Sequence, residues 1–165
     1  MRRSFLLAVL VALAAAPAAH AAHTISQNKH LWSTVNLCDT PQSPDTIGVR
    51  ASMPGSGKKG ERMWMRFRVQ FHSDVDHLWH NFLAEGADSG FQPVGAAKYK
   101  TRQSGWTFPF TLQPGQHFEM RGVVNFEWRK GKKVVRKAVK KTTSKHPTRL
   151  SEPKGYSAAT CVISG

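Results

Sequence analysis

Residues 106–133 read WTFPFTLQPGQHFEMRGVVNFEWRKGKK. In the second half of this stretch, apolar and polar side chains alternate with one break, at Val123, so that the apolar set is Phe118, Met120, Gly122, Val124, Phe126 and Trp128. A period of two is typical of a β-strand with one buried and one exposed face. The stretch therefore predicts a long strand at the centre of an antiparallel sheet.

The flanks of this strand predict its neighbours. Phe108, Phe110 and Leu112 indicate a preceding strand, which is interrupted by Pro109 and joined to the long strand by the turn at residues 113–116. After the long strand, the sequence Lys-Gly-Lys at residues 130–132 predicts a tight hairpin.

A second long strand is predicted at residues 63–71, where Met63, Met65, Phe67, Val69 and Phe71 alternate with Trp64, Arg66, Arg68 and Gln70. The matched alternation predicts a core made of Met65, Phe67, Val69, Phe118, Met120, Val124, Phe126 and Trp128. Shorter strands are predicted at residues 30–38, 47–53, 134–143 and 156–163. In the strand at 134–143 we expect Val135, Val139 and Thr143 to point to the same side, whereas the rest of the strand is basic.

The segment between residues 74 and 105 is harder to interpret. Residues 74–85 predict one short helix, because Asp74 is a candidate N-cap and Leu78 and Phe82 have helical spacing. Residues 86–105 are weakly patterned, and we expect a long loop there with a short strand near Tyr99.

Seven to nine short strands separated by turns predict an all-β fold, a single antiparallel β-sandwich. One short helix lies in a connection, and a closed barrel is the alternative architecture.

A family resemblance supports the sandwich. The stretch TFPFTLQPGQHFEMRGVV, residues 107–124, resembles the strand, Pro-Gly turn and strand signature of bacterial extracellular immunoglobulin-like domains, including the CARDB type. The terminal YSAATCVI is similar to the closing strand of secreted bacterial sandwiches. The resemblance implies an immunoglobulin-like fold and a role at the cell surface. Antibody-type domains, however, place their cysteines in inner strands, whereas Cys38 and Cys161 lie near the two ends of this domain.

The N-terminus has the pattern of an export signal. Arg2 and Arg3 precede an apolar run, and Ala-His-Ala at residues 19–21 fits a cleavage site. We therefore predict a signal peptide at residues 1–21, a flexible N-terminus at 22–29 and a β-sandwich domain at 30–165. The general export route is favoured over the twin-arginine route. The mature protein is then secreted, extracellular or in the cell envelope, with no transmembrane segment.

Cys38 and Cys161 are the only cysteines. An even pair in an exported chain predicts one disulfide, and the alternative is two free buried thiols.

The chain has 24 Lys and Arg against 10 Asp and Glu, a formal net charge of +14. Residues 129–149 contain ten of these basic residues and no acid, which predicts a contiguous positive face. The candidate polyanion-binding residues are Arg129, Lys130, Lys132, Lys133, Arg136, Lys137, Lys140 and Lys141. The competing interpretation is that lysines protect a sheet edge from aggregation. A phosphate-rich or carboxylate-rich polymer would bind mainly by charge, and no motif predicts sequence-specific nucleic-acid recognition.

Histidines give a second candidate site, made of His72, His77, His80 and His117. Imidazoles with a nearby carboxylate, Asp74 or Asp76, suit zinc or copper. Exposed loop histidines that bind nothing are the favoured interpretation, because a His-x-x-His pair is a weak motif. An N-terminal copper site at His23 would require cleavage after Ala22, which places His20 where a small residue is preferred.

No catalytic arrangement is predicted. The chain has no Gly-x-Ser-x-Gly motif, and its glutamates are scattered. We therefore expect a non-enzymatic structural or interaction module without a cofactor, with an anionic cell-wall polymer or an unknown protein as partner. A secreted metal-binding sandwich is the alternative, and a secreted hydrolase ranks third.

Overall fold

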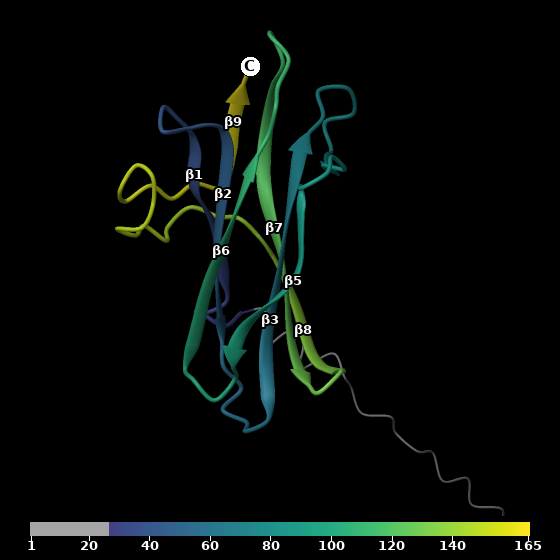
Figure 1. Ribbon diagram of the computed structural model, residues 1–165, viewed down its shortest axis with the longest axis vertical. Coiled ribbons are helices and arrows are strands. Elements are labelled where there is room, and N and C mark those ends of the chain that lie inside the picture. Colours follow the sequence, from purple (N-terminus) through teal and green to yellow (C-terminus); the bar gives the residue numbers. More distant parts are fainter. Residues whose placement is uncertain (1–26) are drawn as a thin grey trace, which may run out of the picture.

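The computed structural model describes residues 27–165. The predicted signal peptide and His23 lie outside the described residues. Within them the chain forms two antiparallel sheets packed as a sandwich, seen edge-on in Figure 1. The described residues contain nine strands and no helix: β1 Trp32–Thr40, β2 Ser43–Pro54, β3 Glu61–His72, β4 Trp79–Asn81, β5 Asp88–Ala96, β6 Thr101–Pro109, β7 His117–Lys130, β8 Lys133–Lys141 and β9 Cys161–Ser164.

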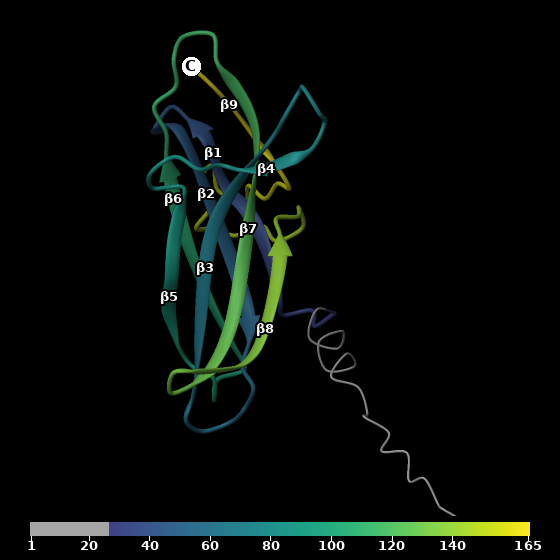
Figure 2. The same ribbon diagram turned by 90° about the vertical axis from the view of Figure 1, so that its right-hand side faces the viewer.

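The smaller sheet has the strand order β1-β2-β6. The larger sheet is organised around β3 and β7, which pair along almost their whole length. The other edge of β3 pairs with β5 and β4, and the other edge of β7 pairs with β8 and β9. Figure 2 shows this larger sheet face-on, with β5, β3, β7 and β8 side by side. Its strands form an open sandwich layer rather than a closed barrel.

The alternating pattern places the core as predicted in β3 and β7. Met65 pairs with Phe126 and Phe67 pairs with Val124, and all four side chains are completely buried. Val69, Met120 and Trp128 are also buried, but Phe118 is only partly buried at the end of the sandwich. From the smaller sheet, β2 adds the buried side chains of Ile47, Val49, Ala51 and Met53.

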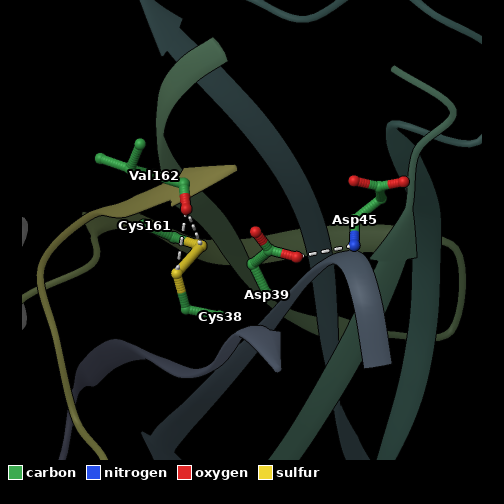
Figure 3. Close-up of a disulfide and its surroundings, with 5 residues drawn as sticks. All are labelled: Cys38, Asp39, Asp45, Cys161 and Val162. Atoms are coloured by element: carbon green, nitrogen blue, oxygen red, sulfur yellow. Dashed lines mark hydrogen bonds between the residues drawn. A yellow bond between two sulfur atoms is a disulfide. The ribbon is translucent and has the colours of Figure 1, made fainter. Parts of the chain in front are cut away.

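The predicted disulfide is confirmed. Cys38 of β1 and Cys161 of β9 are bonded, with their Cα atoms 5.4 Å apart and a sequence separation of 123 residues. Because β1 belongs to the smaller sheet and β9 to the larger, the bond joins the two sheets, as Figure 3 shows. Beside it, Asp39 accepts a hydrogen bond of 2.8 Å from the backbone N–H of Asp45 and supports the short turn between β1 and β2. A disulfide is consistent with an oxidising compartment.

The prediction of a helix at residues 74–85 is wrong. The segment forms a turn followed by β4, which pairs with the end of β3. Asp76 accepts a hydrogen bond of 3.1 Å from the backbone N–H of Leu78, and His77 has a φ angle of 57°, in the left-handed region. These local bonds and backbone angles compete with a helix.

The long loop expected at residues 86–105 is also wrong, because β5 and most of β6 occupy it. Glycines, Pro93 and two irregularities in the pairing with β3 hide the strand pattern of β5. The turn at residues 113–116 is not a hairpin either. It lies where the chain passes from β6 in the smaller sheet to β7 in the larger one.

The segment at residues 142–160 lies along the open edge of β1, visible as the yellow-green loops beside β1 in Figure 1. Val35 exchanges backbone hydrogen bonds of 3.0 Å with Ala158, and Asn36 accepts one of 2.9 Å from Glu152. The rings of Trp32 and His146 stack with centroids 4.2 Å apart. The edge of β1 is therefore closed by the chain itself. Among residues 27–165, no helix is long and apolar enough to cross a membrane.

Candidate functional site

The outer face of the larger sheet carries the strongest concentration of polar and charged side chains. The alternation that buries Met65 and Phe126 turns the intervening residues of β3 and β7 outward. On β3 these are Arg62, Trp64, Arg66, Arg68, Gln70 and His72, and on β7 they are His117, Glu119, Arg121, Val123, Asn125, Glu127 and Arg129. Five arginines therefore share one sheet face.

Two of these arginines are paired with carboxylates. The Nε of Arg66 donates to both oxygens of Asp88, at 2.8 and 3.0 Å, and this contact raises the pKa of Arg66 and lowers that of Asp88. Arg129 forms an ion pair of 2.6 Å with Glu127. Its guanidinium also lies 4.5 Å from the ring centroid of Trp64. The charges of Arg66 and Arg129 are therefore partly neutralised within the protein.

The other two central arginines are held by amides. Arg121 donates from Nε and Nη2 to the side-chain oxygen of Gln70, at 2.9 and 2.8 Å, and its guanidinium lies 4.1 Å from the ring centroid of Trp79. Desolvation lowers the pKa of Arg121. Arg68 donates to Asn125 at 3.0 Å, and its buried Nε has no hydrogen-bond partner. Within residues 27–165 neither guanidinium forms an ion pair, although Arg68 lies opposite Asp88 and its charge contributes to lowering the pKa of Asp88.

The basic segment at residues 129–149 does not form the single face that we predicted. Lys137 lies opposite Glu127 and Lys141 opposite Val123, on the outer face with Arg129. Arg136 and Lys140 lie opposite the buried Trp128 and Val124, on the inner side of an edge strand. Lys130, Lys132 and Lys133 lie at the hairpin tip around Gly131.

A β-bulge explains this difference. Counting back from the tip, regular pairing would place Val135 opposite Trp128 and Val139 opposite Val124, with both valines on the inner face. Instead the register shifts by one residue between Trp128 and Arg129, and every later side chain of β8 changes sides. Val135 and Val139 are consequently 42% and 53% exposed. Charges that point inward from an edge strand also oppose pairing with another chain.

The predicted histidine site is divided between different elements. His72 ends β3, His77 lies in the turn before β4, His80 lies in β4, and His117 begins β7 beside β9. His80 Nε2 contacts Asp76 at 2.8 Å, whereas the ring centroids of His72 and His77 are 6.3 Å apart. In the described part of the chain, no three His, Cys, Asp or Glu side chains are placed to hold a metal ion.

The sequence did not reveal an apolar hollow at the end of the sandwich. It has a volume of about 540 Å³ and is lined mainly by Phe71, Phe82 and Phe118, with His80, Asn81 and Leu83 at its rim. The three phenylalanine rings pack edge to face, with centroids 5.8 to 6.0 Å apart. Phe82 was assigned to a helix by its spacing, so only the pairing of β4 with β3 brings it here.

Comparisons with known proteins give no relative: no family model, no curated protein and no solved structure matches this chain.

Proposed function

We propose that this protein is an exported, non-enzymatic interaction module that binds an anionic polymer through the outer face of its larger sheet. The observation that carries the proposal is the arrangement of Arg68 and Arg121. Both are cations held in place by Asn125 and Gln70, which contribute no neutralising charge. Lys141 lies on the same face, one strand away. Cations that form no ion pair with the described residues are available to phosphate, sulfate or carboxylate groups from outside.

The physical character of the face fits a polymer rather than a small ligand. Its charges come from three neighbouring strands, β3, β7 and β8, and are interleaved with Trp64 and Trp79. A broad face binds many repeating charges weakly, and such binding falls steeply with salt. The architecture, the disulfide and the N-terminal signal pattern further support an immunoglobulin-like module of the bacterial cell surface, the assignment that the CARDB-type resemblance implies.

The proposal is tested by retention on immobilised heparin and on an anionic cell-wall polymer across a salt series. The variant Lys137→Glu/Lys141→Glu reverses two exposed charges of the outer face. The variant Lys100→Glu/Lys154→Glu makes the same change of net charge at two exposed positions elsewhere, in the β5–β6 turn and in the segment at residues 142–160. Exposed charges contribute little to stability, so both variants should fold.

We expect the outer-face variant to elute at clearly lower salt than the control variant. The slope of log affinity against log salt should fall by about one for each polymer contact that is lost. If the two variants elute together, only net charge matters and the outer face is not the binding site.

A further inference from the structure

A second hollow lies on the smaller sheet, along β6. Its volume is about 250 Å³, and it is lined by residues 103–107 together with Asn36, Arg50 and Leu150. Successive side chains of a strand point to opposite faces of the sheet. A hollow lined by five consecutive residues, 103–107, therefore runs along the edge of the strand and not over one face of it. Its wall includes Trp106, which is 39% exposed.

The free edge of β6 is open. β6 pairs with β2 on one side, and among residues 27–165 no strand pairs with its other side. The edge of β1 is covered by residues 142–160, β8 carries inward-pointing charges, and β5 contains Pro93 and two irregularities in its register. These features oppose strand addition, and β6 has them only near its ends, where Arg102 lies opposite the buried Met53 and Pro109 closes the strand. Its outer row of backbone N–H and C=O groups is free to pair with another strand.

Arg50 supplies an unused cation beside this edge. One of its terminal nitrogens donates to the side-chain oxygen of Gln103, whereas Nη1 is buried without a hydrogen-bond partner. Its guanidinium lies 5.1 Å from the ring centroid of Trp32. No acidic side chain of the described residues forms an ion pair with Arg50, and burial lowers its pKa. A desolvated guanidinium with a free donor is suited to a carboxylate.

The residue between Arg50 and the open edge is Gly105. The register places Arg50 directly opposite Gly105, where a Cβ atom would lie 3.1 Å from the Val49 carbonyl oxygen and 3.9 Å from Arg50 Cβ. A strand added beyond β6 would lie two strand spacings from β2, about 9.6 Å. An arginine and a glutamate that extend toward each other can span that distance. A bulkier residue at position 105 would separate them.

We propose that this hollow binds an extended acidic peptide segment, which adds to β6 as a further strand and places one carboxylate against Arg50. Main-chain pairing would supply affinity, and the contact with Arg50 would supply specificity. The site lies on the smaller sheet and does not depend on the polymer-binding face of the larger one.

The test is an NMR titration of the isotope-labelled protein with three capped hexapeptides. The first has one glutamate among threonines, the second has glutamine in its place, and the third is the glutamate peptide with methylated backbone nitrogens. In a fourth titration the glutamate peptide is added to the Arg50→Gln variant. Sodium acetate serves as a probe for a carboxylate without a backbone.

We expect saturable one-to-one shifts at the amides of residues 103–107 with the glutamate peptide. The glutamine peptide, and the glutamate peptide on Arg50→Gln, should each bind about tenfold more weakly, since a charge-assisted hydrogen bond is lost. Backbone methylation should abolish binding. Equal affinity for the glutamate and glutamine peptides, undiminished binding of the methylated peptide, or no saturable shift would each overturn the proposal. If acetate binds as tightly as the peptide, the hollow is a simple anion site and the proposal is overturned. If the β6 signals shift with protein concentration in the absence of peptide, β6 pairs with a second copy of the chain, which also overturns the proposal.

Discussion

Gly122 of β7 lies so close to Val49 of β2 that a Cβ atom on Gly122 would be 2.6 Å from Val49 Cγ2. The side chain of Thr142 lies on the same spot, at 2.8 Å, and its hydroxyl accepts a hydrogen bond of 3.1 Å from the Gly122 N–H. Gly122 has ordinary strand geometry, so its lack of a side chain serves the packing of the two sheets rather than a turn.

Gly122→Ala should therefore destabilise the protein by about 1–3 kcal/mol, because the core has no space for one more methyl group. Urea unfolding measures the loss. Val49→Ala should be costly alone but should recover part of the stability in the double variant, since it makes room for the new methyl. Strictly additive effects of the two substitutions would show that the positions do not compete for space.

Phe126→Ala should cost about 3–5 kcal/mol in the same assay, because Phe126 is a fully buried ring at the centre of the core. Val139→Ala is the matched control on the neighbouring strand, and we expect a change within about 0.5 kcal/mol because Val139 is exposed. A large loss for Val139→Ala would instead support the regular, unbulged register of β8.

The bond between Cys38 and Cys161 closes a loop with a sequence separation of 123 residues. Replacing both cysteines with alanine should lower the free energy of unfolding by about 2–5 kcal/mol, because the unfolded chain gains conformational freedom. Treatment of the wild-type protein with a reductant should shift its urea midpoint similarly. An unchanged midpoint after complete reduction would contradict this account.

Stability should also depend on the protonation of His146. Desolvation and the charge of Arg50 lower the pKa of His146 in the folded state, so the unfolded state takes up the proton more readily. The contribution of neutral His146 is thus complete above its unfolded pKa of about 6.5 and is lost as pH falls through the lower folded value. His146→Phe can keep the stack on Trp32 without titrating. Between pH 7.5 and 5 we expect the wild type to lose more stability than this variant, and equal losses would contradict the assignment.

The two central strands could be predicted because each buries one face completely. Met65 and Phe126 belong to uninterrupted alternations, and no competing local signal obscures them. β5 and β6 could not be predicted, since β5 is broken by glycines and Pro93, and β6 is largely exposed. Their positions depend on pairing with β3 and β2, which are distant in sequence. The helix prediction failed because Asp76 and His77 favour a turn that spacing alone does not reveal.

The candidate site was predictable in part for the same reason. The outward arginines of β3 follow directly from the alternation that identifies its core residues. That Asn125 holds Arg68 of β3, and Gln70 holds Arg121 of β7, depends on the pairing of β3 with β7. The division of the basic segment depends on a single bulge near Trp128, and no pattern in residues 129–141 predicts it. The hollow at Arg50 is assembled from four separate segments, so only the tertiary structure reveals it.

The closure of β1 by the end of the chain has a consequence for biosynthesis. Residues 142–160 cover the edge of β1, and Cys161 must be present before Cys38 can find its partner. While the chain is still emerging, its earliest strand has neither its edge cover nor its covalent link. The native structure can therefore be completed only after the chain has been synthesised as far as Cys161.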